Sequence, residues 1–238
     1  MKLFIATGGK GKRLGELTKD LPKPLVPVAG KPVLHHIVDW AKKNPINEIV
    51  MLNGYKADKI VEYFEDGSKF GIKIVHSNEP HPLDSGGAIK FAEKHIDSQF
   101  AYISGDHICE VNLNKMIGFH KNNISDMTVL VHKSTHPWDA DILQINNNNE
   151  IVKFVSKHDD HTNAGDLSNS GLSIIEPKIL DLMDKEIFNF ENYLYPKMLE
   201  RKMKLMAYVT NEFMADMGTL ERLRKCEEHL LSRQRNHN

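Results

Sequence analysis

The sequence predicts an α/β fold with a parallel, doubly wound sheet over about its first 110 residues. Short apolar runs of strand length alternate there with amphipathic stretches of helical length, as in βαβ units. The first run, Lys2–Ala6, is apolar after its lysine and leads into a glycine-rich turn, which is typical of a buried parallel strand. The 238 residues, 40% hydrophobic and 26% charged, suffice to bury a sizeable core.

The elements of this first half follow in chain order. Pro32 suits a first helical turn, and the apolar residues after it recur at helical spacing. The expected helices cover residues 32–43, 57–64 and 86–95, and the expected strands cover residues 2–6, 48–52, 72–76 and 100–104. Ligands of such sheets bind beyond the carboxyl ends of the strands. The loops after 2–6 and 100–104 are therefore candidate binding positions.

The second half of the chain has a different rhythm. The expected strands cover residues 127–132, 142–145, 151–155, 171–175 and 205–209, and the expected helices cover residues 113–121, 190–200 and 220–231. Four asparagines at 146–149 separate two of these strands and predict a hairpin turn. No linker rich in Pro, Gly or Ser and no repeat divides the sequence, so we expect one domain, 1–238, whose halves meet near residue 110.

Composition excludes several classes of partner. A net charge of −1 gives no global attraction to nucleic acid or to anionic membranes, so an anion site must be local. Cys109 and Cys226 fit no CxxC or zinc spacing and are expected to be buried thiols in a reducing cytoplasm. No stretch reads as a signal peptide or approaches eighteen apolar residues, which predicts a cytoplasmic protein. The last helix could pack against a second copy of the chain, so a homo-oligomer is one of the alternatives.

The glycines after the first strand predict a phosphate-binding loop. Gly8, Gly9 and Gly11 let the backbone approach phosphate oxygens, while Arg13 and Lys23 neutralise charge. The loop does not fit the dinucleotide fingerprint, because Leu14 stands where that motif has its third glycine. It does not fit the P-loop either, which needs Ser or Thr where Arg13 stands. The alternative is an ordinary turn with surface lysines.

Two aspartates stand where a magnesium ion could bind. Asp106 follows the buried strand 100–104, and Asp216 precedes the last helix. A carboxylate at a strand end can hold Mg²⁺ against nucleotide phosphates. The alternative for each is helix or turn capping, with Thr219 as the N-cap of the last helix, three residues before Arg222.

Five spaced motifs resemble those of the sugar-1-phosphate nucleotidyltransferases and stand in the same order. They are Gly8-Gly9-x-Gly11-x-Arg13-Leu14, Lys23-Pro24, Ser104-Gly105-Asp106, Asn169-Ser170-Gly171 and Asp216-Met217-Gly218-Thr219. Within that family the chain looks most similar to the D-glycero-D-manno-heptose 1-phosphate guanylyltransferases, through residues 105–120 and 136–142. The resemblance implies a Rossmann-like three-layer sandwich with a mixed, mostly parallel central sheet.

The resemblance also implies a reaction. Such enzymes join a nucleoside triphosphate, here GTP, to a sugar 1-phosphate, here a heptose 1-phosphate, and release pyrophosphate. The attacking phosphate is already anionic, so alignment and charge neutralisation matter more than a general base. The stretch up to about residue 110 would bind the nucleotide, and the rest would bind the sugar phosphate.

Residue roles carried over by position are as follows. Gly8, Gly9 and Gly11 would cradle the phosphates, Arg13 would hold the departing pyrophosphate, and Lys23 would reach the α-phosphate. Asp106 and Asp216 would bind Mg²⁺, with Asp106 also facing the nucleotide. Lys157 would contact the sugar phosphate, its alternative being a solvated lysine, and Asn169 would reach a sugar hydroxyl.

The base would meet the segment Leu83–Ala88, through Ser85 and Gly86. Asp84 stands there in place of the family's usual glycine. Two other functions stay open at this point. One is a cytidylyltransferase acting on a small phospho-compound such as phosphocholine, and the other is an inactive nucleotide-sugar-binding protein.

Overall fold

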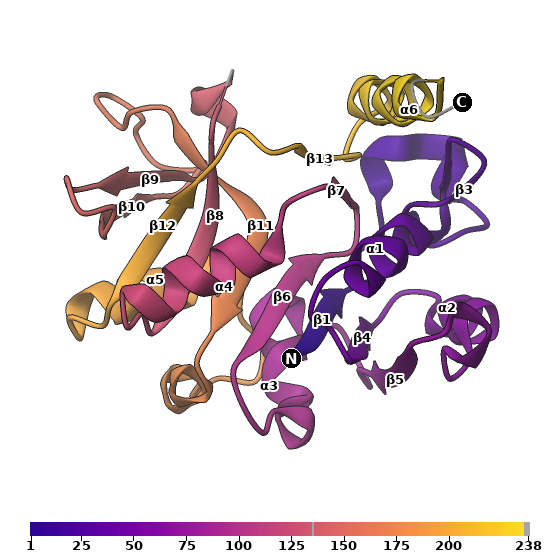
Figure 1. Cartoon of the computed structure of the whole chain (residues 1–238), viewed down its shortest axis with the longest axis horizontal. Helices are drawn as coiled ribbons and strands as arrows, with labels where there is room; N and C mark the ends of the chain where they lie inside the picture. The colour runs from indigo at the N-terminus through magenta and orange to yellow at the C-terminus, as the bar shows by residue number, and fades with distance from the viewer. Residues whose placement is uncertain (135, 236–238) are drawn as a thin grey trace. The chain divides into compact units, whose positions relative to one another are not determined.

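A computed structural model describes residues 1–134 and 136–235 (Figure 1). These residues form two compact units. Unit 1 comprises residues 1–4, 83–103 and 112–211, and unit 2 comprises residues 5–82, 104–111 and the C-terminal stretch from Glu212. Helices alternate with strands along the chain, and the sheet contains both parallel and antiparallel pairs. The α/β fold with a mixed, mostly parallel central sheet is confirmed.

Unit 2 contains the parallel strand pair that follows the first crossover helix. Strand β4 (Glu48–Asn53) pairs in parallel with β5 (Lys73–Asn78), with Met51 opposite His76. The other elements are α1 (Val33–Lys42), α2 (Ala57–Phe64), α6 (Leu220–Arg235), the short ribbons β2 (Pro27–Val28) with β3 (Lys31–Pro32) and β7 (His107–Cys109) with β13 (Met214–Asp216), and the 3-10 turns at Lys12–Thr18, Lys23–Leu25 and Ser68–Phe70. Strand β1 (Lys2–Ala6) enters unit 2 at its carboxyl end.

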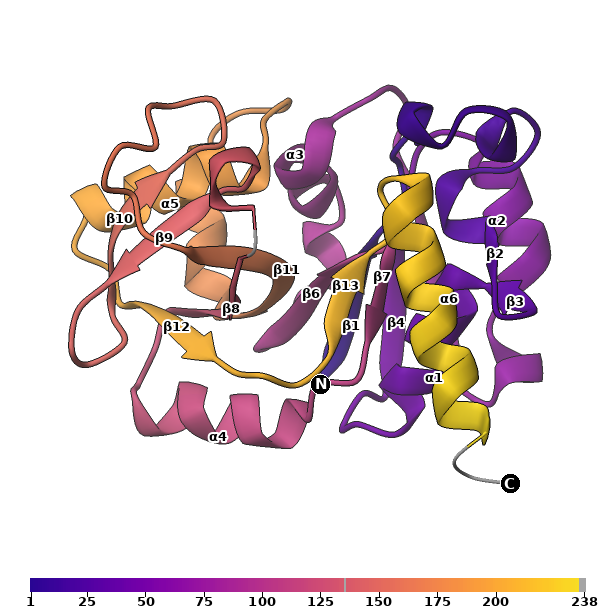
Figure 2. The ribbon, with the colours of Figure 1, turned by 90° about the horizontal axis from the view of Figure 1, so that it is seen from above.

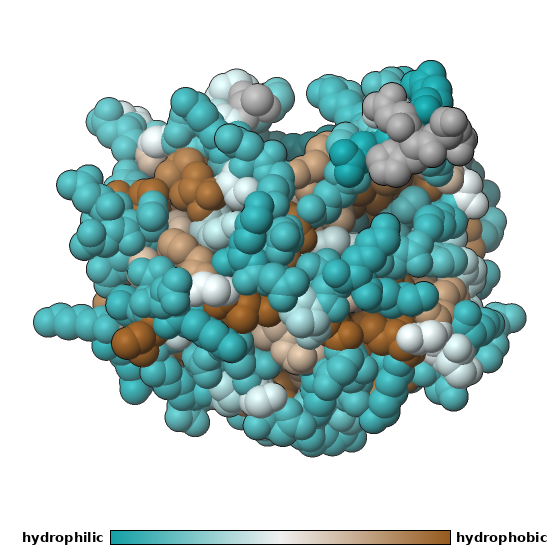
Figure 3. Space-filling view, in the orientation of Figure 1, coloured by the Kyte–Doolittle hydropathy of each residue, from teal (hydrophilic) through white to brown (hydrophobic). Residues whose placement is uncertain are grey.

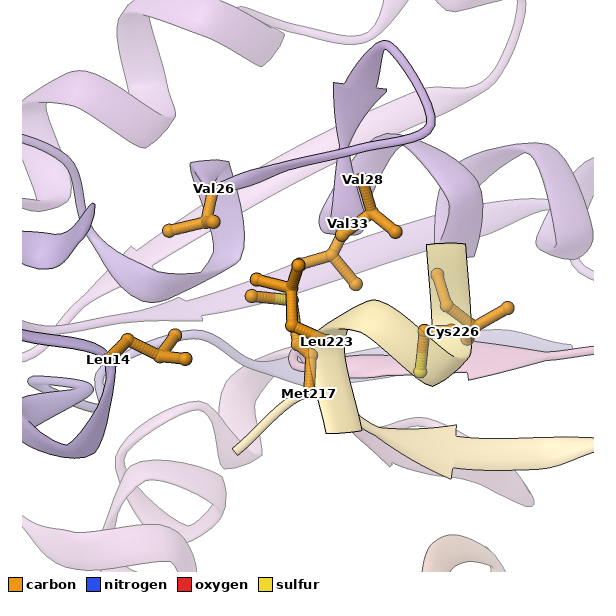
Figure 4. Close-up of a cluster of buried hydrophobic side chains, with 8 residues drawn as sticks. Leu14, Val26, Val28, Val33, Met217, Leu223 and Cys226 are labelled. Carbon is orange, nitrogen blue, oxygen red and sulfur yellow. The ribbon is translucent and has the colours of Figure 1, made fainter. Parts of the chain in front are cut away.

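A buried cluster joins the glycine-loop region to the C-terminal helix within unit 2. Leu14, Val26, Val28, Val33, Ile108, Met217, Leu223 and Cys226 make up this cluster, and seven of them are labelled in Figure 4. In Figure 2, α6 runs beside β13 and the β2–β3 ribbon, and it contacts both. Residues far apart in sequence therefore support the glycine loop.

Unit 1 holds an antiparallel arrangement with one parallel pair. Strand β11 (Leu167–Ile175) pairs antiparallel with β6 (Phe100–Ser104) and β8 (Met127–Lys133), and β8 pairs in parallel with β12 (Leu205–Val209). The hairpin strands are β9 (Ile142–Ile145) and β10 (Ile151–Val155). The helices are α3 (Asp84–Phe91), α4 (Leu113–Asn122) and α5 (Phe190–Glu200), with 3-10 turns at Glu93–His95, Pro137–Asp139 and Pro177–Leu182.

Helices α4 and α5 cover opposite faces of the unit 1 strands (Figure 2). Helix α4 contacts β8, β11 and β12, whereas α5 contacts β10 and β12. Aromatic rings fill the α5 side: the ring centroids of Phe190 and Tyr102 lie 5.0 Å apart, and those of Tyr195 and Phe154 lie 5.3 Å apart. Such pairs add to the energy of burial and hold the first turn of α5 against the sheet.

Most expected elements are present, and the exceptions have physical reasons. The helix expected at 86–95 begins at Asp84, ends at Phe91 and is followed by a separate 3-10 turn. The strand expected at 171–175 begins at Leu167. The β2–β3 and β7–β13 ribbons were not predicted, because segments of two or three residues carry no periodicity. The predicted burial of Cys109 and Cys226 is confirmed, and both are free thiols.

Hydrophilic side chains cover most of the face shown in Figure 3, with smaller hydrophobic patches between them. Among residues 1–134 and 136–235, no helix has the length and apolar character needed to cross a membrane.

Candidate active site

The glycine loop begins where β1 ends, inside unit 2. The Thr7 hydroxyl is buried and donates to the Leu52 carbonyl at 2.8 Å, which ties the start of the loop to β4. Gly11 has φ +64°, and a Cβ there would lie 2.8 Å from the Lys23 Cβ. The Thr18 hydroxyl also donates to the Gly11 carbonyl, at 3.2 Å. Gly11 is therefore required both by its conformation and by the close approach of Lys23.

Gly105 brings the end of β6 against the end of β1. Its amide donates to the Ala6 carbonyl at 2.8 Å, and a Cβ at Gly105 would lie only 2.6 Å from that oxygen. The residue after it, Asp106, is consequently held beside the glycine loop. The loops that follow these two strands therefore lie together in unit 2.

Asp106 is surrounded by cations. Lys23 Nζ forms an ion pair with Asp106 Oδ2, and His107 Nδ1 lies 2.9 Å from Asp106 Oδ1. Burial opposes ionisation of this carboxyl, but His107 and Lys23 together hold its pKa well below the usual range. Burial likewise opposes the charge of His107, while Asp106 and Asp216 raise its pKa above the ordinary value. The carboxylate is thus ionised and paired.

The β7–β13 ribbon places Asp216 beside this pair. Asp216 stands opposite His107 in the ribbon, and the Met217 amide donates to the Asp106 carbonyl at 2.9 Å. The Asp216 carboxylate accepts from Arg222 Nη1 at 2.9 and 3.1 Å and from the Gly218 amide at 2.7 Å. The capping alternative also holds in part, because the Thr219 hydroxyl accepts from the Arg222 amide at 3.3 Å.

Arg13 reaches the turn that follows Asp216. A Cβ built on Gly218 would lie 3.2 Å from Arg13 Nη2, so the guanidinium packs against this glycine. Arg13 itself is exposed. Unit 2 therefore gathers Arg13, Lys23, Asp106 and Asp216, whose segments are spread over more than two hundred residues.

The donor set of unit 2 fits a magnesium ion held partly by substrate. Mg²⁺ prefers oxygen ligands and is commonly bound by one or two carboxylates together with phosphate oxygens and water. Asp216 ends β13, and Asp106 directly precedes β7, the strand that pairs with it, so the two residues offer two carboxylates. In the part of the chain that the structure describes, no group of three or more His, Cys, Asp or Glu side chains could hold a metal. The remaining ligands would therefore come from the nucleotide and from water.

Unit 1 holds the remaining candidates, beginning with the segment Leu83–Ala88. Its glycines pack directly on the chain before α5: a Cβ at Gly86 would lie 2.1 Å from the Phe188 ring, and one at Gly87 would lie 2.1 Å from the Glu186 carbonyl. The Gly86 amide donates to the Phe188 carbonyl at 2.9 Å. The Ser85 hydroxyl accepts from the Phe190 amide, also at 2.9 Å. Ser85 is thus bound to the first turn of α5, and Gly86 to the chain just before that helix.

Asp84 adopts the conformation that a glycine would take most easily. Its φ is +61°, in the left-handed region, and its carboxylate accepts from the Ser85 amide at 2.7 Å. Aspartate tolerates this region better than most residues because its short side chain can bond locally. Position 84 therefore has a left-handed backbone, which glycine adopts most easily, although an aspartate stands there.

Asn169 and Lys157 meet through Asp141. The backbone amide of Asn169 donates to the Asp141 carbonyl at 3.2 Å, and the backbone amide of Lys157 donates to Asp141 Oδ1 at 2.8 Å. The Lys157 side chain is exposed, so its solvated alternative stays open. Asn169 Nδ2 points to Glu191 Oε1, 3.4 Å away, on the first turn of α5.

Three residues of these two groups were not predicted as site residues: His107, Arg222 and Glu191. The clearest sequence signal for Glu191 was its place two residues after Asn189, which caps α5 by accepting from the Asn192 amide at 3.0 Å. Such a glutamate is ordinarily interpreted as a favourable charge at a helix N-terminus. Its contact with Asn169, 22 residues away, has no local signal.

Comparison with known proteins agrees with this geometry. A family model described as nucleotidyl transferase matches residues 2–233. The chain is 32% identical over 223 residues to the D-glycero-alpha-D-manno-heptose 1-phosphate guanylyltransferase of Campylobacter jejuni, which covers 93% of this chain and 96% of that protein. It is 30% identical over 224 residues to mannose-1-phosphate guanyltransferase 2 of Candida glabrata, covering 92% of this chain but only 61% of that relative's length.

Solved structures show the same relationship. HddC from Yersinia pseudotuberculosis has a TM-score of 0.83 at 29% identity, with 96% of this chain and 99% of that chain covered. A structure of the same protein complexed with GMP-PN has a TM-score of 0.82, with the same identity and coverage. The expectation of an enzyme from the nucleotidyltransferases is confirmed. The chain belongs to the nucleotidyl transferase family.

Proposed function

We propose that this chain transfers GMP from GTP to a heptose 1-phosphate or mannose 1-phosphate. The observation that carries the proposal is the grouping of Arg13, Lys23, Asp106 and Asp216 in unit 2. A glycine loop flanked by cations and followed by two carboxylates suits a triphosphate with its metal ion. The names of the guanylyltransferase relatives and the GMP-PN complex of HddC support GTP as the donor.

In the proposed reaction a phosphate oxygen of the sugar 1-phosphate attacks the α-phosphorus of GTP. The bond from that phosphorus to the bridging oxygen breaks, and pyrophosphate leaves. Lys23 would exchange its pairing with Asp106 for the α-phosphate, and Arg13 would hold the leaving pyrophosphate. Mg²⁺ bound at Asp106 and Asp216 would supply charge neutralisation to the phosphates. No proton has to be removed from the nucleophile, because its phosphate is already ionised near neutral pH.

Unit 1 would supply the other contacts of the proposed reaction. Ser85 and Gly86 would meet the base, Lys157 the sugar phosphate and Asn169 a sugar hydroxyl. The division of labour near residue 110, with the nucleotide bound before it and the sugar phosphate after it, remains a prediction. Two free, buried thiols suit a protein of a reducing compartment, which supports the cytoplasm as its location.

Pyrophosphate release tests this proposal directly. The protein is assayed with Mg²⁺, the four common nucleoside triphosphates and a panel of phosphorylated acceptors that includes phosphocholine. We expect GTP with heptose 1-phosphate or mannose 1-phosphate to give the highest kcat/KM. Turnover with CTP and phosphocholine alone would replace the sugar assignment with the cytidylyltransferase, and binding without any turnover would favour the inactive nucleotide-sugar-binding protein.

A further inference from the structure

Glu191 lies at the meeting point of three segments of unit 1. Its own helix begins beside Ser85, whose hydroxyl accepts from the Phe190 amide and, at 3.3 Å, from Asn189 Nδ2. On its other side is Asn169 of β11, whose amide group donates to Glu191 Oε1 at 3.4 Å. Glu191 therefore touches or adjoins both the base segment and the residue expected to meet a sugar hydroxyl.

The orientation of Asn169 makes this contact specific. Asn169 Oδ1 accepts from the Gly171 amide at 3.0 Å, so its Nδ2 must be the atom that faces Glu191. The bond from Nδ2 to Oε1 is long for a hydrogen bond to a charged acceptor. The carboxyl is thus held in place by a rigid partner while it keeps acceptor capacity for a further donor.

The surroundings of Glu191 destabilise its carboxylate when no further hydrogen-bond donor is present. Burial removes water from the carboxyl of this half-buried residue, and Asp141 and Asp84 are close enough to oppose its charge, while its own backbone amide and Asn169 favour the charge. A buried carboxyl without a full set of donors is destabilised, and hydroxyl groups of a ligand are suitable donors. Ligand hydroxyls would stabilise the ionised form here more than they would at a solvated carboxylate.

The same cluster has a cation at its edge. Lys157 is joined through its backbone amide to Asp141, and Asp141 is joined through its carbonyl to the Asn169 amide. Lys157 is exposed, and a lysine whose backbone is tied to this cluster suits a ligand with an anionic end and a hydroxylated body. A quaternary ammonium compound such as phosphocholine has no hydroxyl to donate.

We propose that Glu191 is a specificity-determining residue that accepts a hydrogen bond from a ring hydroxyl of the sugar 1-phosphate, with Asn169 positioning its carboxyl. This inference rests on the proposed function and deepens it. It names a hydroxylated ring as the feature that unit 1 recognises, where the glycine loop recognises only phosphates.

Removal of the contact from both sides provides the test. Glu191→Gln is compared with wild type and with Glu200→Gln, an exposed glutamate at the other end of α5. The substrates are GTP with mannose 1-phosphate and with each of its monodeoxy analogues. With the intact sugar we expect Glu191→Gln to raise the KM for the sugar phosphate at least tenfold, to leave the KM for GTP within twofold, and Glu200→Gln to match wild type.

With one monodeoxy analogue, the difference between wild type and Glu191→Gln should disappear. For that compound wild type and Glu191→Gln should have kcat/KM values within twofold of each other, because the donor that Glu191 accepts from is absent. An equal loss on every analogue, or an equal rise in the KM for GTP, would overturn the inference and assign Glu191 a structural role. If wild type turns over no sugar phosphate, the proposed function fails instead, and the two failures are distinguished by the wild-type assay alone.

Discussion

Glu191 is a carboxyl whose surroundings oppose its ionisation. Burial, followed by the charges of Asp141 and Asp84, raises its pKa from the ordinary 4.5 to about 7, although its own backbone amide and Asn169 act in the opposite direction. The neighbouring Tyr195 hydroxyl stays neutral, because burial and Glu191 raise its pKa well above the ordinary value. Between about pH 4.5 and pH 7, the Glu191 carboxyl of the folded chain therefore keeps a proton that the unfolded chain releases.

The sign of the resulting pH dependence follows from linkage. The contribution of Glu191 to stability is fully present below about pH 4.5 and is lost as the pH rises through about 7. Between pH 5 and pH 8 we expect wild type to lose about 1–2 kcal/mol more of its free energy of unfolding than Glu191→Gln does. Urea unfolding at both pH values measures this, with Glu200→Gln as the control that keeps the wild-type dependence. Parallel curves for wild type and Glu191→Gln would show that the carboxyl ionises normally.

At the scale of elements, periodicity was enough to predict the long strands and helices. The apolar runs that form β4, β6 and β8 and the amphipathic stretch of α1 are visible in the sequence, because burial on one face imposes spacing on the residues. The β7–β13 ribbon, in contrast, pairs residues more than a hundred positions apart through three residues each. Only tertiary contacts specify such a ribbon.

The candidate site divides in the same way. Glycines and aspartates at strand ends stand out in sequence, and the structure brings Asp106 and Asp216 together in unit 2, while their roles remain predictions. Arg222 reads as an ordinary residue in the first turn of α6, since its contact with Asp216 depends on the turn at Gly218. Glu191 is missed for a related reason: what makes it unusual is burial against another strand.

Helix α3 gives an element-scale prediction from two glycines in different surroundings. Gly86→Ala places a Cβ 2.1 Å from the Phe188 ring, and overpacking of this kind should cost about 1–3 kcal/mol of stability. The matched control is Gly118→Ala in α4, where a Cβ would meet no atom within 4 Å. That change should stabilise the chain by about 0.5–1 kcal/mol, since alanine has the higher helix propensity. Equal effects of the two substitutions in chemical denaturation would mean that α3 does not pack on the chain before α5.

At the scale of the whole molecule, ligand binding can be measured through its effect on the free energy of unfolding. A ligand that binds only the folded chain raises its free energy of unfolding by mass action, by about 2.7 kcal/mol at a hundred times the dissociation constant. For a chain of 238 residues that corresponds to an upward shift in Tm of roughly 5–10 °C. In the proposed reaction, the part of this shift that depends on Mg²⁺ comes through Asp106 and Asp216.

Asp106→Asn and Asp216→Asn should therefore reduce the shift in Tm that GTP gives with Mg²⁺ to the smaller shift that GTP gives with EDTA. Both variants should also lose at least a hundredfold in turnover, because each removes a metal ligand from the proposed reaction. Their circular dichroism spectra should match wild type, since neither carboxylate belongs to the hydrophobic core. Asp181→Asn, which changes an exposed carboxylate, is the control expected to keep both shift and turnover. Wild-type behaviour of both site variants would locate the metal ion away from Asp106 and Asp216 and would contradict their assignment as its ligands.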